Sequence, residues 1–543
     1  MTTTEERPVA AAAQRAPRWA YAVAGVVAAL AAMGVGHLVA GWIYPPASPL
    51  LAVGSFVIDL APTPVKEWAI ATFGTADKPI LIASVATVSL ALAAAVGVIA
   101  RRRLRPALIL GAALILLGSV IAVTRPTGRI VDAIPGVAAA ATMSGVLFLL
   151  HKRFLESTEL AEIEVADADD ADAEPESPTD HNARETGAAW TADRRAFLVT
   201  AAGTTAGAAA LGLLGQRIGA PTAPTITAKD LPTPGNSLAP LPAGLETKYD
   251  GISKFATPNT DFYRVDIALS VPRIDQNTWQ LTIDGDVKSP LTLSYAELLD
   301  LPMIEKDITM TCVSNEVGGG YVGSARWLGV PVRELLDRVG VGKGVDQILS
   351  SGDDAITIST PIQALTDDRD ALLAIAMNGE PLSPTHGFPA RLVTPGLYGF
   401  VGSTKWLTKM TATTYAKESA YWTDRDWATE APVLTQSRID TPRGLETNPA
   451  GPTIIGGVAW AQQRGIAKVE VRVDDGEWQE ATLGPDAGID YWRQWYFEWD
   501  ATPGRHTLSA RATDATGELQ TDQKATPFPS GATGWHSIVT NIA

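Results

Sequence analysis

One cysteine is available for chemistry in this chain. Cys312 is the only cysteine among 543 residues, and it stands in the run TMTCVSNEVGGG (309–320), where a strand-like stretch ends in glycines. A glycine-rich backbone can approach a bulky ligand closely. A thiolate here could act as a nucleophile or as a metal ligand, although a lone cysteine is also a common small buried hydrophobe. A nucleophile needs a nearby base, and His386 is the histidine that the surrounding region offers.

The composition excludes several classes of function. A single cysteine forms no internal disulfide and cannot supply a zinc cluster, an iron–sulfur cluster or a CxxCH haem attachment. The net charge of −16 argues against a nucleic-acid partner, because phosphate binding needs clustered lysine and arginine. Hydrophobic residues make up 46% of the chain and charged residues 19%, which suggests membrane spans joined to a water-soluble part.

Apolar runs predict five membrane spans, since a span needs about 20 apolar residues. They cover residues 19–43, 79–100, 106–124, 130–150 and 196–215. The stretch 50–73 is also apolar, but Asp59, Lys66, Glu67 and two prolines interrupt it. We interpret that stretch as an interfacial or re-entrant segment.

Positive charges predict the orientation of these spans. Arginines before the first span place the N-terminus in the cytoplasm, and five spans then leave the basic clusters at 101–105, 151–153 and 194–195 on the cytoplasmic side. We therefore expect everything after about residue 217 on the extracytoplasmic side of a bacterial cell membrane. The run TADRRAFL (191–198) resembles a twin-arginine export signal, which carries folded proteins across the membrane. The alternative is an ordinary positive flank of a span.

The remaining patterns divide the chain into six parts. We predict a four-span module at 1–153, a disordered acidic cytoplasmic linker at 154–193, the signal with the fifth span at 194–217, and a Pro/Thr-rich linker at 218–248. Mixed strand-like and helical runs predict an α+β domain at 249–428. Alternating runs with a turn at Asp475-Gly476 predict an all-β, immunoglobulin-like sandwich at 429–543.

From about residue 249 onward the chain resembles the sulfite oxidase family of molybdenum enzymes. The matching strings are TPNTDFYR (257–264), TCVSNEVGG (311–319), GSARWLGV (323–330), MNGEPL (377–382), HGFPARLVTPGLYG (386–399) and STKW (403–406). The resemblance implies a molybdenum ion held by the dithiolene of one molybdopterin, by oxo or hydroxo ligands, and by one cysteine thiolate, which here is Cys312. The pterin brings two sulfurs, so a single cysteine is enough.

The same resemblance implies further cofactor-binding residues. His386 and Arg391 match the pterin-binding HGFPxR string, and Arg391 would pair with the cofactor phosphate through its guanidinium fork. Lys405, in the STKW match, would lie at the same end of the cofactor. The pterin-contacting acid of the family falls on Asp353 or Asp354, and we select Asp354.

The chain departs from the sulfite-oxidising members at the expected substrate pocket. The arginine five residues after the ligand cysteine is Val317 here, and Arg264 is displaced by one residue from the expected place. Trp427 replaces the expected tyrosine, and the pocket arginine of the sandwich has no clear counterpart near PFPSGATGWH. We keep Arg264 and Trp427 as candidate catalytic residues and predict a substrate other than sulfite.

Two-electron oxygen-atom transfer, the implied chemistry, requires an electron partner. A membrane b-haem usually needs two axial histidines, but His37 lies in the first span and His151 at the opposite face. We therefore expect a separate cytochrome, quinone-linked protein or soluble carrier, with the spans as an anchor or a docking surface. A homodimer through 429–543 is implied by the resemblance alone.

Two other classes of function compete with the enzyme. One is a cell-surface binding or adhesion protein with a vestigial molybdopterin pocket, and intact Cys312, His386 and Arg391 argue against it. The other is a membrane transport or sensing protein, which the shortage of charged residues within the spans disfavours.

Overall fold

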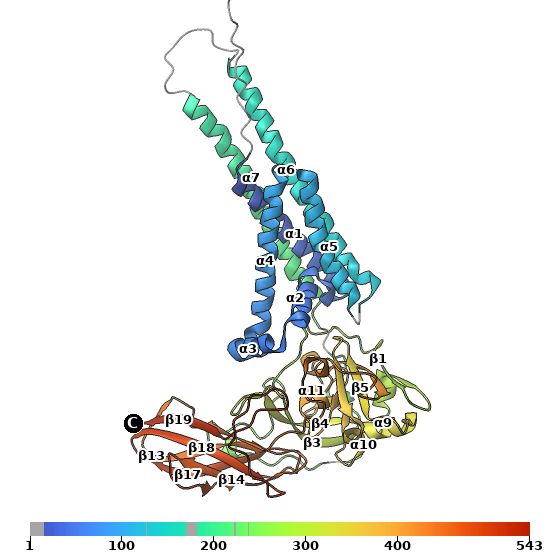
Figure 1. Cartoon of the computed structure of the whole chain (residues 1–543), viewed down its shortest axis with the longest axis vertical. Helices are drawn as coiled ribbons and strands as arrows, with labels where there is room; N and C mark the ends of the chain where they lie inside the picture. The colour runs from blue at the N-terminus through green and yellow to red at the C-terminus, as the bar shows by residue number, and fades with distance from the viewer. Residues whose placement is uncertain (1–15, 126–127, 170–181, 222–223, 237) are drawn as a thin grey trace, which may run out of the picture. The chain divides into compact units, whose positions relative to one another are not determined.

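The computed structural model describes the chain except for residues 1–15, 126–127, 170–181, 222–223 and 237 (Figure 1). It divides into two compact units. One unit consists of Met1–Ala220 with Ala268–Arg273, and the other of Pro221–Ile267 with Ile274–Ala543. The first is helical, and the second carries all of the strands in the described part of the chain.

Seven α-helices build the first unit. They are α1 (Arg18–Ile43), α2 (Pro49–Leu60), α3 (Thr63–Phe73), α4 (Asp77–Ala100), α5 (Leu104–Thr124), α6 (Ile134–Asp169) and α7 (Asn182–Ile218). Five segments within the described residues are long and apolar enough to cross a membrane: Arg18–Ile43, Asp77–Ala100, Leu104–Thr124, Ile130–Arg153 and Phe197–Ile218. The five predicted segments are therefore confirmed as long apolar helices, and their placement in a membrane stays a prediction. The stretch 50–73 forms two short helices rather than one continuous span.

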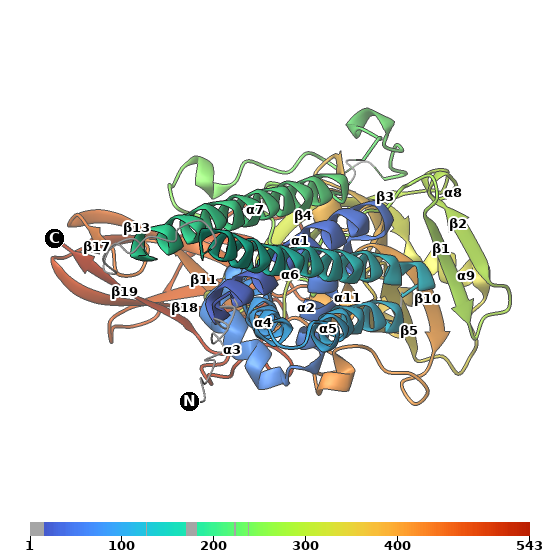
Figure 2. The ribbon, with the colours of Figure 1, turned by 90° about the horizontal axis from the view of Figure 1, so that it is seen from above.

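Small residues let α1 pack closely against its neighbours. Helix α1 contacts α4, α6 and α7, and Figure 2 shows α1 beside α6 and α7. A Cβ added at Gly25 would overlap the carbonyl of Ala93 on α4, and one at Gly34 would overlap the carbonyl of Ala208 on α7. Such glycine contacts bring helix backbones together, which is how apolar helices associate without a hydrophobic driving force.

The acidic segment is a correction to the sequence prediction. We predicted disorder for 154–193, but α6 continues through Asp169 and α7 begins at Asn182, so the prediction is wrong for 154–169 and 182–193. Alanine, leucine and glutamate are strong helix formers, and they extend a helix that the fourth apolar segment has already nucleated. The rest of the predicted linker lies outside the described residues. Arg194 and Arg195 lie within α7, and the twin-arginine interpretation stays a prediction.

His37 on α1 and His151 on α6 lie at different positions along the length of α1. His37 Nδ1 is 3.3 Å from the Ser48 hydroxyl, whereas the His151 ring packs against Tyr21 with centroids 5.7 Å apart. Tyr21 and His37 are separated by about 24 Å along α1, at 1.5 Å per residue. One haem iron could not bind both rings.

Two sheets form the first half of the second unit. One has the order β2-β1-β10-β5-β6 and the other β3-β4-β7-β8, with β9 paired to β7. The strands of the first are β1 (Gln280–Gly285), β2 (Leu291–Ser294), β5 (Gln347–Gly352), β6 (Thr357–Pro361) and β10 (Leu407–Thr413). Those of the second are β3 (Ile304–Thr311), β4 (Val322–Pro331), β7 (Leu372–Met377), β8 (Glu380–Pro381) and β9 (Arg391–Val393).

Short helices connect these strands and complete one hydrophobic core. They are α8 (Tyr295–Leu299), α9 (Val332–Val339), α10 (Ile362–Thr366) and α11 (Gly399–Gly402). Helix α9 buries Val332, Leu335, Leu336 and Val339, which share one face of a helix. It ends at Gly340, whose φ of 67° suits a glycine. The α+β architecture predicted for 249–428 thus holds through this core.

The C-terminal region, from β11 onward, consists of two further sheets. Their orders are β11-β13-β17-β16 and β12-β19-β18-β14-β15, and side chains from both form one core. The first contains β11 (Gln436–Thr441), β13 (Gly451–Trp460), β16 (Thr482–Leu483) and β17 (Arg493–Ala501). The second contains β12 (Thr447–Asn448), β14 (Ile466–Val473), β15 (Gln479–Glu480), β18 (Gly504–Asp514) and β19 (His536–Ile542). The all-β prediction is confirmed, as is the hairpin at Asp475-Gly476, and the immunoglobulin-like assignment stays a prediction.

Candidate functional site

Cys312 directly follows β3 and opens the loop that leads to β4. Its N–H donates to the Tyr321 carbonyl at 2.9 Å, which closes the loop at its base. The Asn315 side chain braces the interior by accepting the Tyr321 N–H at 2.7 Å. Burial raises the pKa of the thiol, and hydrogen bonds from Ser314 and the charge of Lys405 oppose the rise. A positive group at the sulfur would therefore be needed to hold it as a thiolate.

Arg391, at the start of β9, is a buried guanidinium without an anion. It is 6% exposed, and its two terminal nitrogens donate to the His386 carbonyl at 3.0 Å and the Ser403 hydroxyl at 2.7 Å. Its Nε has no hydrogen-bond partner, and no carboxylate of the described residues pairs with it. Burial lowers its pKa to about 10, so the group keeps its charge at neutral pH. A buried, uncompensated charge is costly and is expected to await a counterion.

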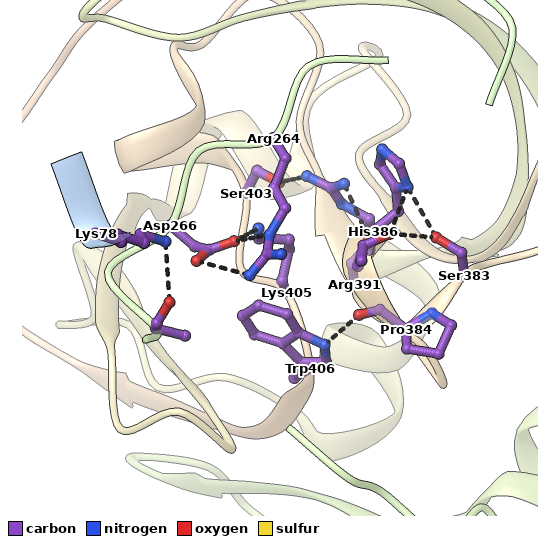
Figure 3. Close-up of polar contacts among 12 residues, drawn as sticks. Lys78, Arg264, Asp266, Ser383, Pro384, His386, Arg391, Ser403, Lys405 and Trp406 are labelled. Carbon is purple, nitrogen blue, oxygen red and sulfur yellow. Dashed lines mark hydrogen bonds and ion pairs between the residues drawn. The ribbon is translucent and has the colours of Figure 1, made fainter. Parts of the chain in front are cut away.

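Lys405 and Arg264 share one carboxylate. Lys405 Nζ lies 2.5 Å from Asp266 Oδ2, and Arg264 Nε lies 2.7 Å from the same oxygen (Figure 3). Burial lowers the pKa of Lys405 to about 8, while Asp266 opposes that effect. The sequence-predicted Arg264 therefore lies beside the predicted cofactor residues, and we call Arg264, Asp266, Arg391 and Lys405 the basic cluster.

His386 uses both ring nitrogens within its own surroundings. Nε2 lies 3.2 Å from the Phe262 carbonyl and must donate to it, which leaves Nδ1 to accept a hydrogen bond. Nδ1 accepts from the Ser383 hydroxyl at 2.8 Å (Figure 3). Burial, together with the charge of Arg391, lowers the pKa of His386 to about 4. The ring is therefore neutral and its two nitrogens are occupied, which disfavours His386 as the base of a Cys312 nucleophile.

Asp354 is a partly buried residue in the turn that follows β5, and its Oδ2 atom is buried. One of its oxygens accepts from the Ile356 N–H at 3.3 Å, and the other has no partner. Burial raises the pKa of Asp354 to about 7, with a contribution from Asp266 and an opposing one from Lys405. A half-satisfied carboxyl at this place can accept or donate a hydrogen bond to a polar ring.

Trp427 lies in a second group of side chains, which is apolar. Its ring contacts Phe400, Trp422 and Phe528 at centroid distances of 5.5, 5.9 and 5.3 Å. Val313, the neighbour of Cys312, belongs to the same packed group. The indole Nε1 is buried without a hydrogen-bond partner. We call Phe400, Trp422, Trp427 and Phe528 the aromatic cluster.

Three residues of the site were missed in the sequence. Asp266 pairs with both Lys405 and Arg264, Ser403 accepts from Arg391, and the partly buried Tyr263 lies within electrostatic reach of Cys312 and Arg391. Each stands within two residues of a matched motif residue, in DFYRVD and STKW. Proximity to the motifs was the available signal, but their partners come from distant parts of the chain.

The side chains of this site fit a cofactor that itself supplies most of the ligands of its metal ion. In the described part of the chain, no three His, Cys, Asp or Glu side chains gather closely enough to hold a metal ion. Among the described residues, a metal at Cys312 would thus not find a set of three such side chains. The unpaired Arg391 guanidinium fits a phosphate, and the half-satisfied Asp354 fits a polar heterocycle.

Comparison with known proteins identifies relatives of this region. Residues 268–422 match the family model described as oxidoreductase molybdopterin binding domain. Mitochondrial sulfite oxidase of Homo sapiens is 30% identical over 323 residues, which cover 50% of this chain and 58% of that protein. Nitrate reductase [NADH] of Solanum lycopersicum is 27% identical over 322 residues, 47% of this chain and 35% of that protein. The chain therefore spans little more than half of the human relative.

A solved structure is also similar. The sulfane dehydrogenase SoxCD from Paracoccus pantotrophus aligns with a TM-score of 0.47 and 23% sequence identity. The alignment covers 54% of this chain and 84% of that one.

Proposed function

Because the chain belongs to the sulfite oxidase family of molybdopterin-binding oxidoreductases, we propose that it is a membrane-anchored enzyme of two-electron oxygen-atom transfer. In this proposal Cys312 binds the molybdenum of molybdopterin, the catalytic region faces the extracytoplasmic side, and a separate protein exchanges the electrons. The substrate is a small molecule other than sulfite.

The observation that carries the proposal is the buried Arg391 guanidinium, with its free Nε, in the same site as the buried Cys312 thiol. Arg391 and Lys405 would hold the cofactor phosphate, and Asp354 and His386 would contact the pterin. The bound cofactor would supply a metal that gains or loses an oxygen atom while it changes by two in oxidation state.

The chain's own residues have three tasks in this scheme. Asp266 keeps Lys405 and Arg264 at fixed positions, as its two short ion pairs support. The charge of Lys405 favours the thiolate form of Cys312. His386 keeps its proton on Nε2, where it donates to the Phe262 carbonyl and remains neutral.

The aromatic cluster supports a substrate other than sulfite. Trp427 and Phe528 offer one N–H donor and no positive charge, and Val317 adds none. An oxyanion needs charged donors when it is desolvated. A neutral molecule such as a sulfoxide or an N-oxide needs one donor and an apolar wall, and Trp427 supplies both.

The membrane arrangement rests on sequence and helix length. The five apolar helices and the basic clusters between them support an anchor that leaves residues after about 217 outside the cytoplasm. The histidine separation along α1 supports an electron partner outside this chain. Dimerisation through the immunoglobulin-like region remains part of the proposal.

Metal analysis of the purified full chain tests the proposal. From a molybdenum-replete host we expect about one equivalent of molybdenum, and turnover of sulfoxides or N-oxides with artificial electron carriers that exceeds turnover of sulfite. Less than about a tenth of an equivalent would reject the metal site and favour a binding protein with a vestigial pocket. Sulfite turnover above that of the neutral substrates would reject the substrate assignment.

A further inference from the structure

The strand and the loop that carry Cys312 are both held by the C-terminal β-region, which the proposed function does not otherwise use. Strand β3 is at the edge of its sheet, so one side of its backbone has no strand partner. Unpaired edge groups must be covered when they are buried. Near Cys312 these groups are covered by backbone and side-chain groups of residues after 430, which also contact the loop, whereas Asn236 pairs with the Glu305 backbone farther from Cys312.

The edge of β3 is completed by turns of the C-terminal region. The Thr309 N–H donates to the Asp490 carbonyl at 2.8 Å, and Gln462 Nε2 donates to the Thr309 carbonyl at 2.9 Å. The Trp492 N–H donates to the Thr309 hydroxyl at 2.8 Å. The backbone three residues before Cys312 is therefore fixed from outside its own sheet.

The glycine loop after Cys312 is held by Arg438 of β11. One terminal nitrogen of Arg438 donates to the Gly319 carbonyl at 2.8 Å, and the other donates to the Ser253 hydroxyl at 2.8 Å. Its Nε pairs with Asp440 at 2.6 Å, and both side chains of this ion pair are about one-tenth exposed. Asp440 also accepts the Ser253 N–H at 3.0 Å. All three guanidinium nitrogens of Arg438 thus donate hydrogen bonds, which fixes the orientation of the side chain.

A β-bulge gives Arg438 and Asp440 this placement. The pairing of β11 with β13 shifts between Ile439 and Thr441, so Asp440 is the extra residue. Gly457 makes the bulge possible, since a Cβ there would overlap the Arg438 carbonyl. Bulges re-aim side chains and are frequent beside functional sites.

His536 of β19 covers the same loop from a second direction. Its Nδ1 accepts the Ile439 N–H at 2.9 Å, and burial with the charge of Arg438 lowers its pKa to about 4. A Cβ at Gly318 would overlap His536 Nε2, so only glycine fits there, and its φ of +81° also favours glycine. The neutral imidazole therefore lies directly against the backbone of the loop.

We propose that Arg438, oriented by Asp440 and supported by His536, is a positioning residue that sets the geometry of the Cys312 loop at the metal site. The C-terminal β-region would then contribute to the geometry of the site. The proposal rests on the proposed molybdenum binding, and it concerns how the thiolate is held. A thiolate displaced by a fraction of an ångström changes the reacting geometry, and misplacements of about 1 Å can cost about a hundredfold in rate.

The test compares Arg438→Met with Arg511→Met in the full chain. Arg511, on β18, is a matched control, because it forms a similar ion pair with Glu470 at 2.9 Å, is partly buried, and packs its guanidinium over the Trp478 and Trp535 rings instead of donating to the loop. In Arg438→Met we expect hydrogen exchange of the amides at 317–320 to rise about tenfold. We expect molybdenum content to stay near wild type, kcat to fall about ten- to a hundredfold with KM within about twofold, and the paramagnetic resonance spectrum of the bound metal to change.

Arg511→Met should leave loop exchange, kcat and the metal spectrum at wild-type values. Equal exchange and equal kcat in Arg438→Met and Arg511→Met would overturn the positioning role. If Arg438→Met does not fold, Arg438→Lys against Arg511→Lys gives the same comparison, with a smaller rise in exchange expected for Arg438→Lys and equality again overturning the role. Hydrogen exchange is also measured on protein from a molybdenum-starved host. If the wild-type chain from a molybdenum-replete host contains no molybdenum, the proposed function is rejected. The hydrogen exchange of the cofactor-free protein then still decides whether Arg438 holds the loop.

Discussion

The basic cluster and the aromatic cluster are built from opposite kinds of side chain, although both adjoin the Cys312 loop. The basic cluster buries two cations, of which Lys405 has Asp266 as a partner and Arg391 has no carboxylate. The aromatic cluster surrounds Trp427 with rings and carries no charge. A buried charge without a counterion costs free energy in the protein alone, whereas packed rings contribute stability by themselves.

The two clusters therefore give different kinds of information about a ligand. The charge of Arg391 becomes favourable only when an anion is bound, so this residue indicates a ligand. The packed rings of the aromatic cluster are favourable without a ligand and disfavour a compact oxyanion, and only the unpartnered Trp427 N–H offers a group that a ligand could use. Replacing one side chain of each cluster in turn tests this difference.

The largest effect is expected for Cys312 itself. Cys312→Ser keeps the approximate size of the side chain and replaces the soft sulfur that would bind molybdenum in the proposed function. We expect turnover to fall to background while the melting temperature of the cofactor-free chain changes little. Turnover and metal content are measured together, and turnover retained with bound molybdenum would refute Cys312 as the ligand.

A change in the basic cluster should have opposite effects on the empty and the loaded chain. Arg391→Met removes the unpaired buried charge, so we expect the cofactor-free chain to gain about 1–3 kcal/mol in free energy of unfolding. The same variant should retain less molybdopterin after purification. Thermal unfolding with metal analysis checks both, and Arg369→Met, at a partly exposed pair with Asp367, is the control. Loss of stability in the empty chain would show that Arg391 is a structural residue.

A change in the aromatic cluster should affect substrates selectively. Trp427→Phe keeps the ring and removes the unpartnered N–H, so we expect kcat/KM for neutral oxo substrates to fall about three- to tenfold. Sulfite turnover should not change. Trp422→Phe in the same cluster should leave both unchanged. An equal loss with Trp422→Phe would assign the effect to packing instead of the Trp427 donor.

The smallest effect is expected for Asp354, through pH. Its pKa is raised from 3.8 to about 7 in the folded chain, so the unfolded chain loses this proton first and stability falls as pH rises from about 4 to 7. Asp354→Asn removes that loss. The gain in melting temperature of the cofactor-free variant should therefore be larger at pH 8 than at pH 5.5. A gain independent of pH would contradict the raised pKa.

The sequence predicted those parts of the molecule that depend on local patterns. Apolar length placed the five apolar helical segments within a few residues. The matched strings selected His386, Arg391 and Lys405, which the structure brings close together. The disordered linker was predicted wrongly, because acidic composition was given more weight than the helix preference of alanine and glutamate.

The partners of the site residues were not predictable from pattern. Asp266 meets Lys405 across 139 residues, and Arg438 meets Gly319 across 119. A lone aspartate or arginine in a sequence carries no mark of such a contact, since the fold and a β-bulge decide it. The motifs therefore selected residues that lie together in the fold, while the arrangement of strands determined which charges are paired.

The covered edge of β3 has a consequence for the order of synthesis, folding and cofactor loading. The contacts that complete this strand join Thr309 to Gln462 and Trp492, across 153 and 183 residues. Synthesis proceeds from the N-terminus, so Cys312 emerges from the ribosome long before the residues that hold its strand. The cysteine reaches its final position only after translation of the C-terminal region. Loading of a cofactor into this site is thereby coupled to a finished chain, and a truncated product would leave it unfilled.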